Sequence, residues 1–342
     1  MHATEPEITP QRVRHLPLAG GVPRAAPRTA RLSLTDRCDL ACVYCRPSRS
    51  DGYIDRRLDD EAWKTMVRAL VETGVRRFRL TGGEPLLHPR VVALVEFVAS
   101  LGVHDLALTT NGTRLLRLAR PLRDAGLMRL TVSIDSLVPE RFWRITRGGR
   151  LDEVLSGVES ARAAGFSEIK TNTVVLRGDN DDELISIVEW AWQRDITPRF
   201  IELMRVGEGA RLPKEKLFGA SEMRARLEPI IGPEPGTLQP NRGPARYVCS
   251  RSSPDHVVGF ITGSTDTYCS TCDRLRVASD GTLRPCLATN DGVEAMAPAR
   301  RGDIGAVVDA IGEAWSMKPD GRTWKGCTES TAADVSMRAI GG

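Results

Sequence analysis

The amino-acid sequence predicts an α/β protein in which six strand–helix units come first and a smaller, irregular region follows. From about residue 30 to residue 205, short β-like runs alternate with amphipathic, helix-like segments. Several of these segments end at a glycine, the residue that most readily caps a helix in the left-handed conformation. Six such units in a row predict parallel strands joined by helical crossovers. The rhythm breaks beyond residue 205, and we therefore place a domain boundary near residue 210.

The expected elements follow one another in chain order. Strands are expected at residues 30–35, 76–81, 105–110, 128–134, 168–176 and 197–204, and the clearest helices at 59–72, 90–101, 152–164 and 181–194. Prolines and glycines are dense between residues 207 and 244, two strand-like runs follow at 246–248 and 257–262, and a last helix is expected at 303–315. The chain thus divides into an arm (1–28), a parallel barrel (29–210) and a C-terminal domain (211–342).

Composition and charge exclude several classes of protein. The chain has 342 residues, 41% of them hydrophobic, which is enough for a sizeable core. No stretch approaches the roughly 18 uninterrupted apolar residues of a membrane span, and the N-terminus lacks the apolar region of a secretory signal. The net charge of +4 is too small to indicate nucleic-acid binding. We therefore expect a cytoplasmic protein with a flexible N-terminal arm and without a membrane or nucleic-acid partner.

Six of the eight cysteines fall into two groups of three. The groups are Cys38, Cys42 and Cys45, spaced C-x3-C-x2-C, and Cys269, Cys272 and Cys286, spaced C-x2-C-x13-C. Closed zinc sites and ordinary iron–sulfur clusters use four protein ligands, so three thiolates leave one metal position open for chemistry. A zinc site stays an alternative, with a distant fourth ligand in the first group and with Cys249 or His256 in the second. Cys249 and Cys327 are otherwise expected to be free, buried thiols.

Polar and glycine-rich motifs collect where the predicted strands end. In a parallel α/β barrel, the carboxyl ends of the strands carry the active site. The cysteine loop follows the first strand and Thr81-Gly82-Gly83-Glu84-Pro85 follows the second, and the later ends carry Thr109-Thr110-Asn111-Gly112, Ser133, Asp135, Glu202 and Met204. Each motif alone is compatible with an ordinary turn, but their common position on one rim predicts a single site.

The C-x3-C-x2-C spacing, followed one strand later by GGEP, resembles the radical S-adenosylmethionine (SAM) superfamily. The resemblance becomes more specific further along the chain. The segments "RLSLTDRCDLACVYC", "RLTGGEPLLH", "LTTNG", "VSIDS", "EIKTNTVV", "RFIELM" and "YCSTCDRLRVASDGTLRPCL" together resemble the GTP 3′,8-cyclase family of molybdenum-cofactor biosynthesis. This likeness covers the chain from about Arg31 to its last residue.

The resemblance implies a fold and two kinds of cofactor. The fold would be a partial (β/α)6 TIM-type barrel, open on one side, with a smaller C-terminal domain that carries an auxiliary iron–sulfur cluster. Each group of three cysteines would hold a [4Fe-4S] cluster with one open iron, which binds SAM in the first cluster and contacts guanine in the second. Family positions for SAM binding match Tyr44, Gly83, Ser133 and Met204.

The resemblance also implies the substrate and its contacts. GTP-binding positions of the family match Arg31, Arg79, Thr109, Lys170, Arg274, Leu275 and Arg276, and catalytic positions match Arg31, Arg274, Arg276, Gly341 and Gly342. A triphosphate requires cations that grip its oxygens. Arg274 and Arg276 would share one face of a strand, although their spacing alone favours a solvated charge pair. Lys170 lies within a predicted strand, where a long cationic side chain has no role in a core.

In this family the reaction is a lyase reaction of the radical SAM type. It converts GTP to (8S)-3′,8-cyclo-7,8-dihydroguanosine 5′-triphosphate by removing hydrogen from ribose C3′ and joining that carbon to C8 of guanine. The resemblance implies a reductase or flavodoxin-type electron donor and cyclic pyranopterin monophosphate synthase as the next enzyme, and it leaves a homodimer open.

Two features depart from the family pattern, Arg46 after the third cysteine and the absence of a histidine in 317–327.

Two alternatives remain open at this point. One is another radical SAM enzyme with an auxiliary cluster, such as a peptide-modifying enzyme. The other is a non-catalytic zinc-binding or nucleic-acid-binding module, for which the charge of +4 is small.

Overall fold

The computed structural model describes residues 26–50, 52–235, 243–265, 268–320 and 337. Most of the predicted N-terminal arm, Cys327, and the catalytic candidates Gly341 and Gly342 lie outside the described residues. In the described part of the chain, no helix combines the length and the apolar character that crossing a membrane requires.

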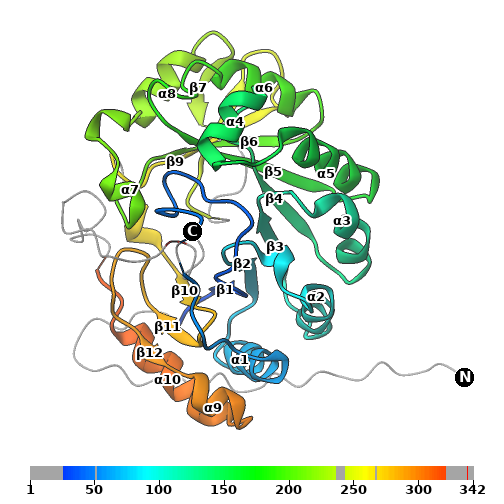
Figure 1. Ribbon diagram of the computed structural model, residues 1–342, viewed down its shortest axis with the longest axis vertical. Coiled ribbons are helices and arrows are strands. Elements are labelled where there is room, and N and C mark those ends of the chain that lie inside the picture. The colour runs from blue at the N-terminus through cyan, green and yellow to red at the C-terminus, as the bar shows by residue number, and fades with distance from the viewer. Residues whose placement is uncertain (1–25, 51, 236–242, 266–267, 321–336, 338–342) are drawn as a thin grey trace, which may run out of the picture.

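Six parallel strands form the centre of a curved sheet (Figure 1). They are β1 (Thr29–Ser33), β2 (Arg77–Thr81), β3 (Asp105–Thr110), β4 (Arg129–Ser133), β5 (Glu168–Val175) and β6 (Thr197–Glu202). They pair in chain order with all neighbours parallel. The six strands predicted from the sequence are confirmed, each with its ends within two residues of the prediction.

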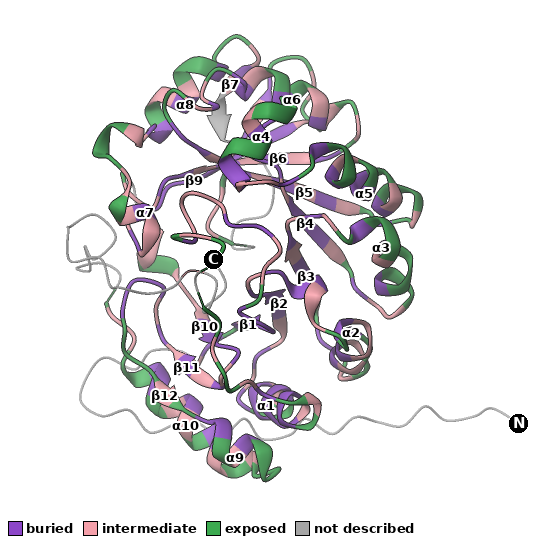
Figure 2. Ribbon diagram, viewed as in Figure 1, coloured by how far each residue is buried: buried purple, intermediate pink, exposed green. Residues whose placement is uncertain are grey.

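Helices cover the outer face of these strands (Figure 1). They are α1 (Asp60–Glu72), α2 (Val91–Ser100), α3 (Leu115–Asp124), α4 (Pro139–Thr146), α5 (Leu151–Ala163) and α6 (Leu184–Trp192). Neighbouring residues of a strand point to opposite faces. Phe78 and Leu80 of β2 are therefore fully buried under the helices, whereas Arg77 and Arg79 line the interior of the barrel. Figure 2 shows this pattern, with buried residues along the strands and exposed residues on the outer surfaces of the helices.

The prediction of a helix over residues 181–194 is wrong at its beginning, because α6 starts only at Leu184. The preceding residues form a turn held by their own side chains. The Asp181 carboxylate accepts the Gly178 N–H at 2.6 Å, and the Asn180 side chain accepts the Leu176 N–H at 2.8 Å. Short polar side chains that bond to nearby backbone compete with helix formation in this way.

The C-terminal part extends the same sheet at both of its edges. At one edge, β9 (Val257–Ile261) pairs in parallel with β6, followed by β8 (Arg246–Ser250) and β7 (Ile231–Pro235). At the other edge, β10 (Arg274–Val277) pairs in parallel with β1, followed by β11 (Thr282–Arg284) and β12 (Val293–Glu294). The predicted C-terminal domain thus supplies strands to both edges of the open barrel.

Further helices support these two extensions. They are α7 (Glu208–Arg211), α8 (Ala220–Leu227), α9 (Met296–Arg300) and α10 (Ile304–Ser316), with short 3-10 turns at Pro85–Leu87, Lys214–Lys216 and Cys269–Thr271. Helices α9 and α10 pack against α1, and Val307, Ile311 and Trp315 of α10 belong to the same hydrophobic core as the barrel strands β1 to β4. A second core joins β6, β8 and β9 to α6 and α8.

Candidate active site

One large cavity occupies the interior of the barrel and its open side. Residues from all six central strands line it, and β9 and β10 contribute Ile261, Arg274 and Arg276 from the two edges. Most residues predicted to form the site lie on its wall, namely Arg31, Cys38, Cys42, Tyr44, Cys45, Arg79, Gly83, Thr109, Ser133, Lys170, Met204, Arg274 and Arg276. Segments that are far apart in the sequence therefore meet at one place, as the common rim of motifs predicted.

The first cysteine group lies on a loop that rests against the end of α4. The Ala41 N–H donates to the Thr146 carbonyl at 3.1 Å, and the Val43 N–H donates to the Ile145 carbonyl at 3.0 Å. Arg46 stands where the family frequently has methionine, and its buried guanidinium donates to the Tyr53 hydroxyl and the Arg49 carbonyl, each at 3.0 Å. The departure from the family pattern thus has a structural role in closing this loop.

The thiols of the first group lie in surroundings that disfavour negative charge. Burial, together with the nearby Glu84 carboxylate, raises the pKa of Cys38 to about 12. Burial likewise raises the pKa of Cys42, and Asp135 and the two other cysteines of the group add to the shift. Thiolates are metal ligands, and only a strong cationic partner would keep them ionised here. Three thiols on one loop are a donor set that an iron–sulfur cluster can use, and the iron of such a cluster would supply this positive charge.

The Gly82-Gly83-Glu84 turn docks on the backbone that follows β1. The Gly83 N–H donates to the Thr35 carbonyl at 2.7 Å, and a Cβ on Gly83 would lie only 2.4 Å from the Arg37 carbonyl oxygen. Gly83 is thus needed for the close approach of two protein loops, in addition to its place on the cavity wall. The Glu84 carboxylate then links this turn to β3, accepting the Thr110 hydroxyl at 2.8 Å and the Asn111 N–H at 2.7 Å.

Tyr44 connects the cysteine loop to the end of β4. Its hydroxyl donates to the Asp135 carboxylate at 2.6 Å, and the other oxygen of Asp135 accepts the Val174 N–H at 2.9 Å. Burial raises the pKa of Asp135 to about 6. The Asp135 side chain is therefore held from both sides, by the cysteine loop and by β5.

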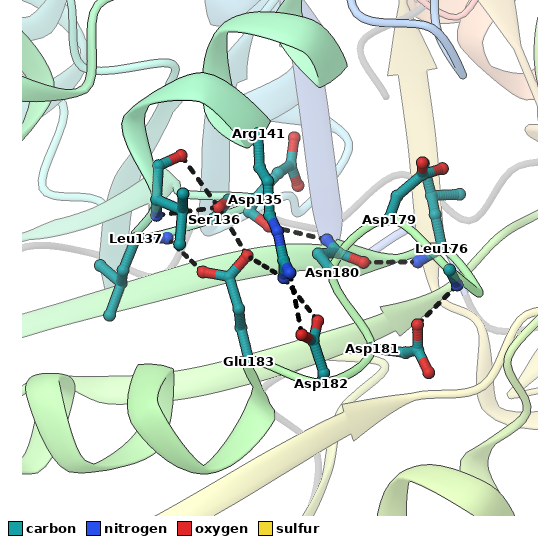
Figure 3. A network of polar contacts seen from close by, with 12 residues as sticks. Asp135, Ser136, Leu137, Arg141, Leu176, Asp179, Asn180, Asp181, Asp182 and Glu183 are labelled. Atoms are coloured by element: carbon teal, nitrogen blue, oxygen red, sulfur yellow. Dashed lines mark hydrogen bonds and ion pairs between the residues drawn. The ribbon is translucent and has the colours of Figure 1, made fainter.

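A polar network fixes the backbone around Asp135 (Figure 3). The buried Asn180 side chain donates to the Asp135 carbonyl at 2.7 Å and to the Val174 carbonyl at 2.9 Å. The Glu183 carboxylate accepts the Ser136 hydroxyl at 2.7 Å and the Leu137 N–H at 2.8 Å. The turn before α6 thereby holds the segment after β4, next to the predicted SAM residue Ser133.

Arginines crowd the wall of the cavity on the β1 and β10 side. Arg31 of β1 is paired in register with Arg276 of β10, which is 7% exposed. Burial lowers the pKa of Arg31, and the neighbouring Arg276 and Arg274 lower it further. The interpretation of Arg274 and Arg276 as a solvated pair is therefore wrong. Because arginines grip anionic oxygens and several of them lie close together here, this wall is suited to a polyanionic ligand.

Other cations that line the cavity are paired with acids. Arg79 donates to Asp105 at 2.5 Å, and Lys170 lies 2.7 Å from Glu168 and 3.3 Å from the Tyr247 hydroxyl. The side chains of Arg79 and Lys170 both line the cavity. The cavity thus contains closely spaced arginines on β1 and β10 and further cations that are paired with acids.

The second cysteine group lies next to the arginines of β1 and β10, but its three thiols are not among the groups that line the cavity. Cys269 and Cys272 flank a 3-10 turn, Cys286 follows β11, and their neighbours Tyr268, Asp273 and Leu287 line the cavity. Burial raises the pKa of the Cys272 thiol, but the cations of Arg274 and Lys318 outweigh it, and the pKa is lowered to about 7. In the described residues, no three His, Cys, Asp or Glu side chains converge as the ligands of one metal ion would.

Known protein families match nearly the whole described chain. Residues 32–191 match the model of the Radical SAM superfamily, and residues 196–324 match that of Molybdenum Cofactor Synthesis C. "GTP 3',8-cyclase 1" of Pseudomonas aeruginosa is 42% identical over 297 residues, which are 84% of this chain and 89% of that protein. "GTP 3',8-cyclase" of Heliobacterium modesticaldum is 40% identical over 278 residues, 80% of this chain and 84% of that protein. This chain belongs to the GTP 3′,8-cyclase family.

The fold of this GTP 3′,8-cyclase also resembles a solved structure. Streptococcus suis SuiB bound to S-adenosylmethionine aligns with a TM-score of 0.60 at 14% identity, over 80% of this chain and 64% of that one. At this identity the likeness shows the fold alone. The predicted α/β fold with a partial barrel of parallel strands is confirmed by the strand pairing and by the match to the Radical SAM superfamily.

Several of the residues that line the cavity were not predicted from the sequence. Arg77, Arg129, Asn172, Arg199 and Tyr268 line the same cavity as the predicted residues. A signal was present, because cations at alternate positions of buried strands, as in Arg77-x-Arg79, predict an inward-facing charged row. Leu275 behaves differently, since its side chain is fully buried in the hydrophobic core. A contact of Leu275 with substrate would have to come from its backbone.

Proposed function

We propose that this chain catalyses the radical cyclisation of GTP to (8S)-3′,8-cyclo-7,8-dihydroguanosine 5′-triphosphate in molybdenum-cofactor biosynthesis. The observation that carries the proposal is the cavity that joins the loop of Cys38, Cys42 and Cys45 to the wall of Arg31, Arg274 and Arg276. A radical-generating site and a polyanion site share one chamber. The identity of 42% to a protein named GTP 3',8-cyclase 1 supports the substrate.

We assign the first cysteine group to a [4Fe-4S] cluster and the adjoining wall to SAM. With SAM bound, such a cluster supplies a carbon-centred radical that takes a hydrogen atom from the substrate. The residues Tyr44, Gly83, Ser133 and Met204 would position SAM. Tyr44 is preorganised for this by its hydrogen bond to Asp135, and the small Gly263 leaves room for the Met204 side chain beside the cavity.

We assign the cationic residues of the cavity to the triphosphate and the base. Arg31, Arg79, Thr109 and Lys170 would bind GTP together with Arg274, Leu275 and Arg276. The additional cations Arg77, Arg129 and Arg199 make the same chamber more favourable for a charge of about −4. Each charge-assisted hydrogen bond contributes about 1.5–3 kcal/mol. Arg31, Arg274 and Arg276 would also act in catalysis, because they hold the substrate at the place where its ring closes.

We assign Cys269, Cys272 and Cys286 to a second [4Fe-4S] cluster next to the guanine base. The donor set again consists of three thiols, and Cys272 lies two residues before the cavity residue Arg274. Gly341 and Gly342 lie outside the described residues, and we infer from the family pattern alone that this slender tail takes part in catalysis.

The remaining inferences concern the cellular setting. The reaction is of the lyase type and needs an electron, which a reductase or flavodoxin-type protein would deliver. Cyclic pyranopterin monophosphate synthase would consume the product, and a homodimer is the oligomer we would look for first. Seven described cysteines are free thiols, which suits the reducing cytoplasm.

The experiment that tests the proposal is anaerobic incubation of the reconstituted chain with SAM, a reductant and GTP. We expect formation of 5′-deoxyadenosine that depends on GTP and not on ATP, together with a cyclised nucleotide triphosphate. Deoxyadenosine that forms equally without GTP would favour another radical SAM reaction. Bound zinc without iron uptake would favour the non-catalytic module.

A further inference from the structure

Lys318 reaches from the end of α10 to both segments that carry the second cysteine group. Its ammonium donates to the Arg274 carbonyl at 2.9 Å and to the Pro285 carbonyl at 2.6 Å. Arg274 lies two residues after Cys272, and Pro285 directly precedes Cys286. One ammonium therefore binds the backbone next to two of the three thiols, on either side of the β10–β11 hairpin.

The ammonium of Lys318 lies near the thiols of the second cysteine group. The thiols of Cys272 and Cys286 lie within electrostatic reach of the ammonium, as does the guanidinium of Arg274. A lysine ammonium has three N–H donors, and two of them serve the two carbonyls. Because this ammonium is largely removed from water, a nearby anion stabilises its charge in addition to the two hydrogen bonds with carbonyls. Anionic thiolates of a bound cluster would balance it.

The side chain of Lys318 lies against the end of α10, next to Trp315. Lys318 follows α10 by two residues, and its ammonium lies 5.0 Å from the centre of the Trp315 ring. Trp315 itself is buried in the core that α10 shares with the barrel. The ammonium is thus held by the rigid end of a helix and not by a surface loop.

We propose that Lys318 is a positioning residue of the second cluster, which fixes the distance between Cys272 and Cys286 and raises the reduction potential of the cluster with its positive charge. The inference rests on the proposed function, because it requires that these cysteines hold a cluster. A cation beside a cluster stabilises the reduced, more negative state, and hydrogen bonds around the ligands tune clusters in the same sense.

The test uses the full chain with Cys38, Cys42 and Cys45 replaced by alanine, so that only the second site takes up iron. In this background Lys318→Met removes both hydrogen bonds and the charge, whereas Lys318→Arg keeps the charge. Lys214→Met removes an equal charge from an exposed position and serves as the control. The measurements are iron per chain, the reduction potential from a titration followed by electron paramagnetic resonance, and the rate at which a chelator removes the cluster.

The parent should hold about four irons. We expect Lys318→Met to lower the potential and to lose its cluster several-fold faster, Lys318→Arg to stay near the parent potential, and Lys214→Met to match the parent. Absent iron uptake by a Lys318→Met variant with an unchanged circular dichroism spectrum would also support the inference. If Lys318→Met has the reduction potential of the parent and loses its cluster at the parent's rate, the inference is overturned. Absence of iron in the parent would instead overturn the second cluster and with it that part of the proposed function.

Acylation of the unmutated, cluster-loaded chain decides the matter if Lys318→Met does not fold. Mass spectrometry of the lysine peptides should show that Lys318 reacts at least about ten-fold more slowly than Lys214, because the thiolates hold its ammonium charged and hydrogen-bonded. Removal of the clusters should raise the reactivity of Lys318 but not that of Lys214. Equal reactivity of Lys318 before and after cluster removal would contradict the proposed contact.

Discussion

The two cysteine sites contain the same three donors in opposite electrostatic surroundings. Around the first group, burial and the carboxylates of Glu84 and Asp135 raise the thiol pKa values, to about 12 for Cys38. Around the second, Arg274 and Lys318 overcome the effect of burial, and the pKa of Cys272 is lowered to about 7. The cysteine spacing alone does not reveal this difference, because the neighbours come from β2, β4 and α10.

The difference indicates a division of labour between the sites. Buried carboxylates beside the first site would compensate the positive charge of the SAM sulfonium group. Arg274, one of the cations beside the second site, belongs to the wall on which we place the anionic substrate. The first site thus suits a cationic cofactor, and the second suits an anionic substrate.

The largest expected effect comes from removing one cysteine group at a time. The reconstituted chain should contain about eight irons, and replacing either group by alanine should leave about four. Loss of Cys38, Cys42 and Cys45 should abolish deoxyadenosine formation, whereas loss of Cys269, Cys272 and Cys286 should abolish cyclisation and retain some SAM cleavage. Iron analysis and chromatography of the two nucleoside products check this. Equal SAM cleavage by both triple variants would erase the distinction between the sites.

Thiol reactivity in the cluster-free chain tests the electrostatic contrast itself. At pH 8 a thiol of pKa about 7 is mostly ionised, whereas one of pKa about 12 is about 0.01% thiolate. We therefore expect iodoacetamide to modify Cys272 orders of magnitude faster than Cys38. The Cys272 rate should level off above pH 7, while the Cys38 rate should still rise at pH 9. Peptide mass spectrometry after quenching measures both, and superimposable pH profiles would show that the surroundings do not differ.

A smaller effect is expected from removing one cation of the substrate walls. Lys170→Ala and Arg31→Ala should weaken GTP binding roughly ten- to a hundred-fold, because each loses a charge-assisted contact of about 1.5–3 kcal/mol. Calorimetry with GTP measures this, with iron content and SAM binding expected to stay near normal. Lys214→Ala, at an exposed position, is the matched control. If all three variants bind GTP alike, the phosphate assignment fails even where SAM cleavage survives.

The smallest expected effect concerns a buried carboxylate of the first site. Glu84 accepts hydrogen bonds at both oxygens, and the amide nitrogen of glutamine cannot accept one. Glu84→Gln should therefore lower the free energy of unfolding by about 1–3 kcal/mol. Glu61→Gln is the control, since its carboxylate is 77% exposed on α1. Urea denaturation of the cluster-free chains compares the two variants. An unchanged free energy of unfolding for Glu84→Gln would show that this carboxylate does not stabilise the first site.

Much of the fold and part of the site were predictable because local patterns encode them. The apolar alternation of strands such as β2, and the glycines after the helices, depend on neighbours within a few residues. The pairing of β9 with β6 and of β10 with β1 could not be predicted, because an edge strand has no sequence signature for its partner.

Long-range polar contacts were hidden for the same reason. Tyr44 and Asp135 are 91 residues apart, and Lys318 meets the Arg274 backbone across 44 residues. The inward cations Arg129 and Arg199 were missed because a single charge in a strand does not reveal which face it occupies. The family resemblance supplied the roles of Arg31 and Lys170, and the structure supplied their surroundings.

The central claim is that the radical made at the first site takes hydrogen from the ribose of a GTP held at the second. The most direct measurement uses GTP carrying deuterium at C3′, with SAM and reductant under anaerobic conditions. The account predicts that deuterium appears in 5′-deoxyadenosine in step with the cyclised triphosphate. Deoxyadenosine without deuterium, formed while GTP is consumed, would contradict it.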